Sequence, residues 1–344
     1  METNAKAALH VAILVAVAIL MISPAVQAND LEADGQRKTP RALHFVLRHV
    51  DVEKVYWMTD LASVSGFNAI QVLVTDGVRL DSAPWLALDD AWTKQEFMDW
   101  VAHAHGKGMQ IVPEVKLLTH QERLFQNLHS DLMYNKSTYD PRNDLTYKVV
   151  FELLDEIIEI VQPHALHIGH DEVAGHSKKS REKWLHEGEG MLPADLYLQD
   201  VLRIHAYLQE RRIETWLWSD MLVSRAEFPN MSDAPLHGSM PGYGKALRDR
   251  IPREIVMCVW HYFDRQEEFE TVGKLAKEGF RVIGASWKRE STMKNLSLFA
   301  SENGANGMIA TTWYLVQREQ WQEVEDIIHE SGKSFRRYFP DSSQ

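Results

Sequence analysis

Cysteine is nearly absent from this sequence. Cys258 is the only one among 344 residues, so no disulfide can form within the chain. For the same reason, no cysteine follows the apolar stretch near the N-terminus, where a lipid anchor would be attached. A chain of this length can bury enough apolar surface to fold without disulfides. The fold must therefore be held together by packing.

Runs of basic residues are also missing. Asp and Glu outnumber Lys and Arg by 49 to 37, which gives a formal net charge of −12. Proteins that bind nucleic acids neutralise phosphates with clustered Lys and Arg side chains. We therefore expect no nucleic-acid partner.

One long apolar stretch lies close to the N-terminus. Residues 11–22 read VAILVAVAILMI, follow Lys6, and are followed by SPAVQA. This pattern predicts a signal peptide over residues 1–28, hence an exported (periplasmic or secreted) protein with no stable membrane insertion after cleavage. An uncleaved anchor is the alternative, because Glu2 offsets the charge of Lys6. Residues 29–40 are expected to form a short N-terminal segment.

Beyond Pro40, short β-rich apolar runs alternate with longer amphipathic stretches. The eight runs are residues 42–47, 69–75, 109–114, 165–169, 213–219, 254–260, 280–286 and 307–312. Repeated strand–helix alternation predicts an α/β fold, a (β/α)8 TIM barrel over residues 41–340. A doubly wound open sheet is the alternative. It would normally carry a glycine-rich phosphate loop after its first strand, which VLRHVDVEK does not provide.

Two of the amphipathic stretches carry clear helix signals. Thr93 and Glu96 have the spacing of a capping box at the start of a helix that ends in glycines. Residues 145–161 place apolar side chains at helical spacing, which predicts that Leu145, Val149, Leu153, Ile157 and Val161 share one buried face.

The barrel prediction directs attention to the residues that follow each strand, because active sites of this fold lie at the carboxyl ends of the strands. Carboxylates, histidines and tryptophans dominate these positions. Tryptophan can cover the apolar face of a sugar ring, and carboxylates can bind hydroxyls or move protons. The residues are Arg48, His49, Asp76, Glu114, His120, His170, Asp171, Glu172, Asp220, His261, Trp287 and Trp313.

The fourth run ends in two adjacent carboxylates, Asp171 and Glu172, in the stretch LHIGHDEVAGH. Desolvating both is costly, and neighbouring like charges resist joint ionisation. A purely structural origin at an exposed helix start is the alternative. No metal site is predicted, because HDEVAGH lacks the i, i+4 histidine pair of a zinc helix, and no cofactor is expected. His167, between apolar neighbours, is predicted to be a core histidine.

Several motifs together resemble glycoside hydrolase family 20, the β-N-acetylhexosaminidases. HIGHDEV is similar to the family's H-x-G-G-D-E signature, and VPEVKLLTHQ is similar to its P-E motif with a histidine six residues later, His120. PRALHFVLRH resembles the first strand, whose leading arginine binds sugar hydroxyls, here Arg41. VLVTDG resembles the second-strand motif that ends in Asp76. WSDM and TTWYL resemble the tryptophan motifs of strands five and eight, with Trp218 and Trp313.

The resemblance implies a retaining reaction in which the 2-acetamido oxygen of the substrate is the nucleophile. Glu172 would be the general acid and then the base, and Asp171 would orient the acetamido group. Asp76 and His120 would form a relay with Glu172. The implied partner is an amino-sugar-containing glycan with terminal β-linked GlcNAc or GalNAc.

The other expected substrate-binding residues come from strand-end positions. Trp260 is expected beside Trp218 and Trp313 in the pocket wall, with His170 and Asp220 as further contacts. Trp184 is expected to be a packing residue.

Three departures from the family pattern leave substrate identity open. His170 replaces the second glycine of the signature, Leu315 stands where a glutamate is usual, and GASWKRES shows no clear strand-seven tyrosine. A related glycosidase with altered sugar specificity and a catalytically weak glycan-binding protein are therefore the alternative functions.

Overall fold

The computed structural model describes residues 38–341, apart from 123–124, 126–128 and 233. The predicted signal peptide and most of residues 29–40 lie outside this part of the chain. Within the described residues, no helix is both long and apolar enough to cross a membrane.

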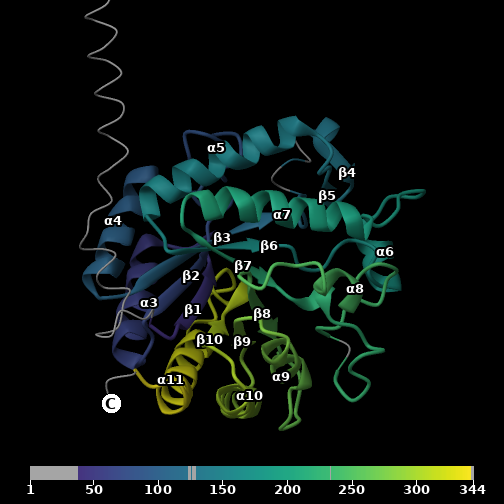
Figure 1. Cartoon of the computed structure of the whole chain (residues 1–344). Helices are drawn as coiled ribbons and strands as arrows, with labels where there is room; N and C mark the ends of the chain where they lie inside the picture. The colour runs from purple at the N-terminus through teal and green to yellow at the C-terminus, as the bar shows by residue number, and fades with distance from the viewer. Residues whose placement is uncertain (1–37, 123–124, 126–128, 233, 342–344) are drawn as a thin grey trace, which may run out of the picture. The chain divides into compact units, whose positions relative to one another are not determined.

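Eight parallel strands close into a barrel, as the sequence predicts (Figure 1). Their order around the barrel is β1-β10-β9-β8-β7-β6-β3-β2, so the first strand pairs with the last. A separate two-stranded hairpin lies between β3 and the following helix. The barrel strands are β1 (Arg41–Val46), β2 (Ala69–Leu73), β3 (Gln110–Leu117), β6 (Ala165–Gly169), β7 (Glu214–Trp218), β8 (Val256–Trp260), β9 (Val282–Ser286) and β10 (Met308–Thr311), and the hairpin strands are β4 (Met133–Asn135) and β5 (Thr138–Tyr139).

Helices surround the barrel (Figure 1). They are α3 (Val52–Ser65), α4 (Lys94–Gly106), α5 (Asp144–Val161), α6 (Lys178–Trp184), α7 (Ala194–Glu210), α8 (Lys245–Arg248), α9 (Glu270–Lys277), α10 (Glu290–Glu302) and α11 (Trp321–Tyr338). Side chains of successive strand residues point to opposite faces. In β1, His44 contacts Glu114 inside the barrel, whereas Phe45 packs 5.9 Å from the ring of Trp100 on α4.

All eight predicted strands are present, and their ends differ from the predicted ends by a few residues. The largest difference is in β3, which continues past Glu114 to Leu117. In its pairing with β6, Glu114 lies opposite His167 and Leu117 lies opposite Gly169. Three residue steps on β3 therefore match two on β6, which is a bulge in β3. Such a bulge bends the strand and changes where its side chains point. It falls at the carboxyl end of the barrel strands.

The helix predictions are confirmed at the start of α4 and need a correction in α5. The Thr93 side chain accepts a hydrogen bond from the Glu96 backbone, and the Glu96 carboxylate accepts one from the Thr93 backbone. In α5, Leu153, Ile157 and Val161 are buried as predicted. Leu145 is 59% exposed, so its place on the buried face was predicted wrongly. It lies in the first turn of the helix, and Val149, one turn further along, is half-buried.

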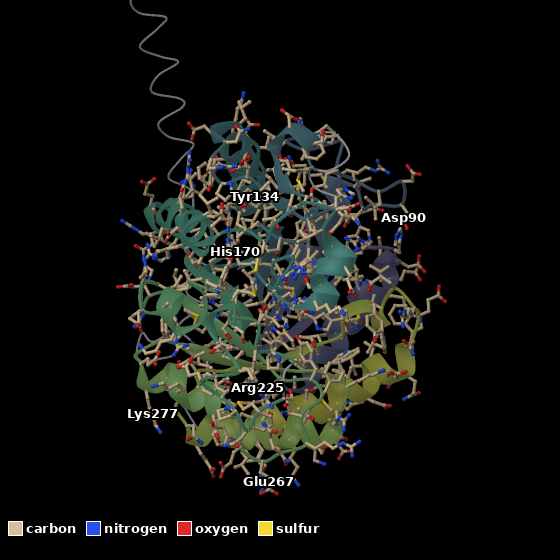
Figure 2. All side chains as sticks on the ribbon, turned by 90° about the vertical axis from the view of Figure 1, so that its right-hand side faces the viewer. Asp90, Tyr134, His170, Arg225, Glu267 and Lys277 are labelled. Atoms are coloured by element: carbon tan, nitrogen blue, oxygen red, sulfur yellow. The ribbon has the colours of Figure 1, made fainter. Side chains whose placement is uncertain are left out.

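A fully buried carboxylate joins helices α5 and α7 to the end of strand β6. Asp200 on α7 accepts hydrogen bonds from Tyr139 at 2.9 Å, from Tyr147 on α5 at 2.6 Å, and from the Nε2 atom of His170 at 2.8 Å. Figure 2 shows His170 well inside the molecular outline, and its side chain has no exposed surface. Because these three donors come from separate parts of the chain, Asp200 fixes the loop after β6 to the helical layer.

We predict that Asp200→Ala destabilises the protein by about 3–5 kcal/mol, because it leaves three buried donors without an acceptor. Asp155 provides a matched control, since it also accepts hydrogen bonds from a tyrosine and an arginine but is 57% exposed. Asp155→Ala should cost about 1 kcal/mol or less. Urea unfolding measures both values, and equal losses would contradict the structural role given to Asp200.

Candidate active site

The carboxyl ends of the barrel strands surround a cavity of about 700 Å³. Charged groups lie on its floor, and its wall is largely aromatic. The charged and titratable residues are Arg48, Lys116, His120, Glu122, Asp171 and Glu172. The aromatic residues are Trp184, Trp218, Trp260, Tyr262, Phe263, Trp287, Trp313 and Tyr314.

The loop after β6 brings Asp171 and Glu172 to this cavity through an unusual backbone path. Gly169, His170 and Glu172 have φ values of 75°, 67° and 50°, in the left-handed region that side chains other than glycine rarely adopt. The backbone N–H of Glu172 donates to Asp220 at 2.9 Å. Asp171 is buried, whereas the Glu172 side chain is 44% exposed, so the two carboxylates occupy different environments. Strain of this kind is concentrated at functional sites.

His120 lies between the two carboxylates. Its Nε2 atom is 3.4 Å from Oδ2 of Asp171 and 3.7 Å from Oε2 of Glu172. Desolvation lowers the pKa of the imidazole and the Lys116 charge lowers it further, but Asp171 and Glu172 outweigh both effects and raise it above the ordinary value. His120 therefore keeps its proton to a higher pH than a free histidine does.

Lys116 is the closest cation to Asp171 among the described residues. Its Nζ atom lies 3.0 Å from both carboxylate oxygens of Asp171 and 3.2 Å from Oε1 of Glu114. Burial raises the pKa of Asp171, but Lys116 and His120 reverse this and hold it below the ordinary value. Asp171 is consequently an anion at neutral pH.

Glu114 carries the second negative charge that Lys116 contacts, inside the barrel. Gln71 donates to it at 2.7 Å and the Trp218 indole at 3.2 Å, and the Nε2 atom of His44 lies 3.1 Å away. Burial would raise the pKa of Glu114, but Lys116 and the nearby histidines hold it well below the ordinary value. The side chain has no exposed surface, so Glu114 supports the cavity floor from below.

His167 is a core histidine, as the sequence predicts. It has no exposed surface, and its Nδ1 atom accepts a hydrogen bond from the Gly169 backbone at 3.1 Å. Burial lowers its pKa to about 4, so the ring is neutral near neutral pH.

Two predicted substrate contacts prove to be supports that lie behind the cavity. Asp220 is fully buried and accepts hydrogen bonds from the Glu172 backbone, from His237 at 2.8 Å and from the Trp260 indole at 3.4 Å. His170 uses one ring nitrogen for the Ile168 carbonyl and the other for Asp200. Neither side chain reaches the cavity, so both predictions of substrate contact were wrong.

Arg41 was also predicted wrongly as a sugar ligand. It is the first residue of β1 and therefore lies at the amino end of the barrel, opposite the cavity. There it donates to the carbonyls of Gly66 and Phe339 at 2.7 and 2.9 Å, and it pairs with Asp341.

The arginine at the other end of β1 does reach the cavity. Arg48 lines it and contacts Asp76 through Nε at 2.9 Å and Nη2 at 2.8 Å. Asp76 is 1% exposed, so it lies behind Arg48 and acts on the cavity through its contact with this arginine. The other predicted relay member, His120, contacts Asp171 and Glu172 directly.

Trp218, Trp260 and Trp313 lie on the cavity wall, where strand ends were expected to place them. The rings of Trp218 and Trp313 are 5.8 Å apart, and those of Trp260 and Tyr262 stack at 5.0 Å. Trp184 also lines the cavity, 6.3 Å from the His120 ring, so its prediction as a packing residue was wrong.

Lys116 and Tyr262 also line the cavity, and neither was predicted to do so. Lys116 carried a readable signal, because it is two residues beyond Glu114 and residues at that spacing share one face of a strand. Tyr262 follows β8, which is the sixth barrel strand along the chain. The family tyrosine was expected after the seventh barrel strand, β9. Burial raises the pKa of the Tyr262 hydroxyl well above the ordinary value, so this group is a hydrogen-bond donor. Leu315, at the position where a glutamate was expected, is fully buried.

The same cluster has the chemistry of a cation site but an unfavourable charge arrangement. Single ligand atoms from His120, Asp171 and Glu172 lie within 4.8 Å of one another. One imidazole and two carboxylates can bind a divalent ion. However, the Lys116 ammonium contacts both oxygens of Asp171, so an ion there would face a neighbouring positive charge.

A (β/α)8 barrel with an acid pair in an aromatic cavity at its carboxyl end defines the class as glycoside hydrolase. Comparison with known proteins gives the family. The model of "Glycosyl hydrolase family 20, catalytic domain" matches residues 73–327. The chain belongs to this family.

Similar proteins agree with this assignment. "Beta-hexosaminidase 1" of Coccidioides posadasii is 21% identical over 271 residues, which cover 69% of this chain and 41% of the relative. "Beta-hexosaminidase" of Emericella nidulans is 20% identical, with the same coverage. The chain thus spans less than half the length of these relatives.

Solved structures share the fold at low sequence identity. The family 20 β-N-acetylhexosaminidase of Streptomyces coelicolor A3(2) has a TM-score of 0.62 at 15% identity, and covers 90% of this chain and 66% of its own. The chitobiase of Flavobacterium johnsoniae has a TM-score of 0.61 at 17% identity, with 86% and 48% covered. Dispersin B has a TM-score of 0.57 at 15% identity, with 88% and 98% covered.

The raised pKa of His120 predicts a pH-dependent contribution to stability. Below about pH 6.5, the ordinary pKa, the ring is protonated in both states and its attraction to Asp171 is fully present. As the pH rises through the higher pKa of the folded state, this stabilisation is lost. His120→Asn removes the charge, and asparagine tolerates the φ of 57° at this position.

We therefore expect the difference in unfolding free energy between wild type and His120→Asn to be largest near about pH 6 and to shrink toward about pH 9. Urea unfolding across this range measures the difference. A difference that stays constant with pH would mean that His120 contributes through packing alone.

Proposed function

We propose that this protein is an exo-β-N-acetylhexosaminidase that releases terminal β-linked GlcNAc or GalNAc. It acts with retention of configuration, and the 2-acetamido oxygen of the substrate is the nucleophile. The observation that carries the proposal is the pair Asp171 and Glu172, with one carboxylate buried beside Lys116 and the other 44% exposed to the cavity.

Glu172 is suited to the role of general acid and base. Its side chain lines the cavity, and its backbone is fixed by the hydrogen bond to Asp220. A general acid must reach the departing glycosidic oxygen and later accept a proton from water. An exposed carboxylate on a rigid backbone can do both as the substrate enters and the leaving group departs.

Asp171 is suited to hold the acetamido group. It is buried, anionic, and contacted by Lys116 and His120 on its protein side. An anion close to the acetamido nitrogen stabilises the positive charge that develops there when the carbonyl oxygen attacks the anomeric carbon. These two different roles explain why two adjacent carboxylates follow a buried strand.

The aromatic wall supports a sugar substrate that carries an apolar substituent. Trp218 and Trp313 contact each other and the barrel floor, and can enclose an acetamido methyl group. Positioning of this kind converts a mobile amide into a pre-aligned intramolecular nucleophile. Both relatives carry the name beta-hexosaminidase, which supports the same substrate class.

Two other functions remain distinguishable by assay. A family member with altered specificity would cleave a chromogenic substrate other than β-GlcNAc or β-GalNAc, and Leu315 favours this alternative because it is buried and offers no polar contact to outer hydroxyls. A catalytically weak glycan-binding protein would bind these sugars without turnover. A panel of β-GlcNAc, β-GalNAc and β-glucoside substrates, with measured binding, separates the three.

We predict that Glu172→Gln lowers kcat by about 10²–10⁴-fold for substrates with alkoxide leaving groups and much less for activated aryl leaving groups. The reason is that activated leaving groups depart with little proton donation. Steady-state kinetics on both substrate types measures the effect. Glu122→Gln is the matched control, since Glu122 also lines the cavity but accepts a hydrogen bond from Ser137 at its edge. Equal losses on both substrates would remove Glu172 from the acid role.

We predict that progressive fluorination of the N-acetyl group slows hydrolysis steeply, because fluorine withdraws electron density from the attacking oxygen. The measurement is the slope of log kcat/KM across the mono-, di- and trifluoroacetyl series. A flat series, or efficient cleavage of a plain β-glucoside, would replace the acetamido mechanism with attack by a protein carboxylate.

A further inference from the structure

Lys116 holds an unusual position for a cation in this site. It lies near the carboxyl end of β3, within the strand bulge between Glu114 and Leu117, and its side chain is only 13% exposed. Its Nζ atom makes contacts of 3.0 Å to each oxygen of Asp171 and 3.2 Å to Glu114, and it lies 5.2 Å from the centre of the Trp313 ring. Two carboxylates, those of Asp171 and Glu114, are thus the acceptors that hold this ammonium group.

Because the shortest contacts of Lys116 are with Asp171, its main effect on the site passes through this carboxylate. Both oxygens of Asp171 face the same ammonium, which fixes the rotation of the carboxylate about its Cβ–Cγ bond. The ammonium itself is fixed by Glu114, which Gln71 and Trp218 hold in place. The orientation of Asp171 is thereby tied to the barrel interior.

The charges around Asp171 come from several elements. Lys116 and Glu114 lie on β3, His120 follows β3, and Glu172 is the next residue along the chain. The charge of Asp171 also acts to raise the pKa of four more distant groups, which are His167, Tyr197, His237 and Tyr262. Of the nearest groups, Glu114 and Glu172 are acidic, His120 is titratable, and Lys116 supplies the one permanent positive charge.

We propose that Lys116 is a positioning residue that keeps Asp171 ionised and correctly oriented, and that its charge makes the site select an uncharged 2-acetamido group over a free 2-ammonium group. The proposal rests on the proposed function, in that Asp171 is taken to face the substituent on C2 of the sugar.

The first consequence concerns pH. Without Lys116, burial and the charge of Glu114 would still raise the pKa of Asp171, and only His120 would lower it. The pKa of Asp171 would then rise, and the acid limb of the kcat/KM profile would move to higher pH. An opposite charge at this distance lowers a carboxyl pKa by about 1–3 units, so the limb should move by about one unit or more.

The second consequence concerns substrate choice. A carboxylate without a cation beside it would attract a 2-ammonium group. Asp171 instead already has the Lys116 ammonium 3.0 Å away, with His120 nearby. A second cation at the sugar nitrogen would be repelled by both, whereas the N–H of an acetamido group can still donate to Asp171. Glucosamine should therefore inhibit the wild-type enzyme far more weakly than N-acetylglucosamine does.

The test compares Lys116→Met with Lys116→Arg, which keeps the charge. Lys288→Met is a matched control, because Lys288 also lies 4.9 Å above a tryptophan ring, that of Trp287, and pairs with the exposed Glu323. Three readouts are taken for each variant: the kcat/KM profile against pH, the ratio of inhibition constants for glucosamine and N-acetylglucosamine, and the protonation of Asp171 in the free enzyme. The last is followed by the carboxyl ¹³C signal that is lost in Asp171→Asn.

We expect Lys116→Met to move both the acid limb and the Asp171 titration upward by about one pH unit or more. We expect the same variant to lower the glucosamine to N-acetylglucosamine ratio by about tenfold. Lys116→Arg and Lys288→Met should leave the titration near its wild-type position. If Lys116→Met does not fold, Lys116→Gln serves with the same expectations, because its amide is neutral and can still donate to Asp171.

An Asp171 titration and an inhibitor ratio that stay at wild-type values in a folded Lys116→Met protein would overturn the proposal and leave Lys116 a structural residue. The titration needs no substrate. If the enzyme cleaves no amino sugar, the proposed function fails, and an unchanged or shifted titration still decides the effect of Lys116 on Asp171.

Discussion

The contact of Lys116 with Glu114 on one side and Asp171 on the other is the interaction on which this site depends. Neither carboxylate could remain charged at such depth without a nearby cation, because burying an uncompensated charge costs several kcal/mol. The barrel interior and the cavity floor are therefore one electrostatic unit. Its inner end is held by Gln71 and Trp218, and its outer end by His120 beside Glu172. Asp171 keeps its charge because the side chains directly below it, Lys116 and Glu114, are charged.

Backbone strain in this protein is concentrated near the same place. Positive φ values occur soon after the carboxyl ends of barrel strands, at His49, Leu118, His120, His170, Glu172 and Trp313. Each such residue costs of order 1–3 kcal/mol unless its surroundings compensate. At Glu172 and His170 the compensation is visible, since Asp220 and Asp200 bind the strained loop from behind. The positions of the two carboxylates are thus determined by a buried framework.

Local patterns in the sequence predict the strands, the barrel and the acid pair, because strand periodicity and the order of motifs are written along the chain. The directions in which side chains point at the site cannot be read from such local patterns. His170 turns away from the cavity because Asp200, thirty residues later on α7, accepts a hydrogen bond from its ring. Arg41 lies at the far end of the barrel because it begins its strand, although its motif resembles a sugar-binding one. Lys116 could have been found from its spacing to Glu114, but its contact with Asp171 depends on how β3 and β6 pair across the bulge.

Because the first barrel strand pairs with the last, the barrel closes late during synthesis of the chain. β1 pairs with β10, and Arg41 binds the Phe339 carbonyl and the Asp341 carboxylate, a contact that spans 300 residues. A ribosome must therefore synthesise the chain through β10 before β1 can acquire its second neighbour. Until then β1 and the most recently made strand are open edges, and open edges invite pairing with other chains. Arg41, although remote from the chemistry, helps to end that period of exposure.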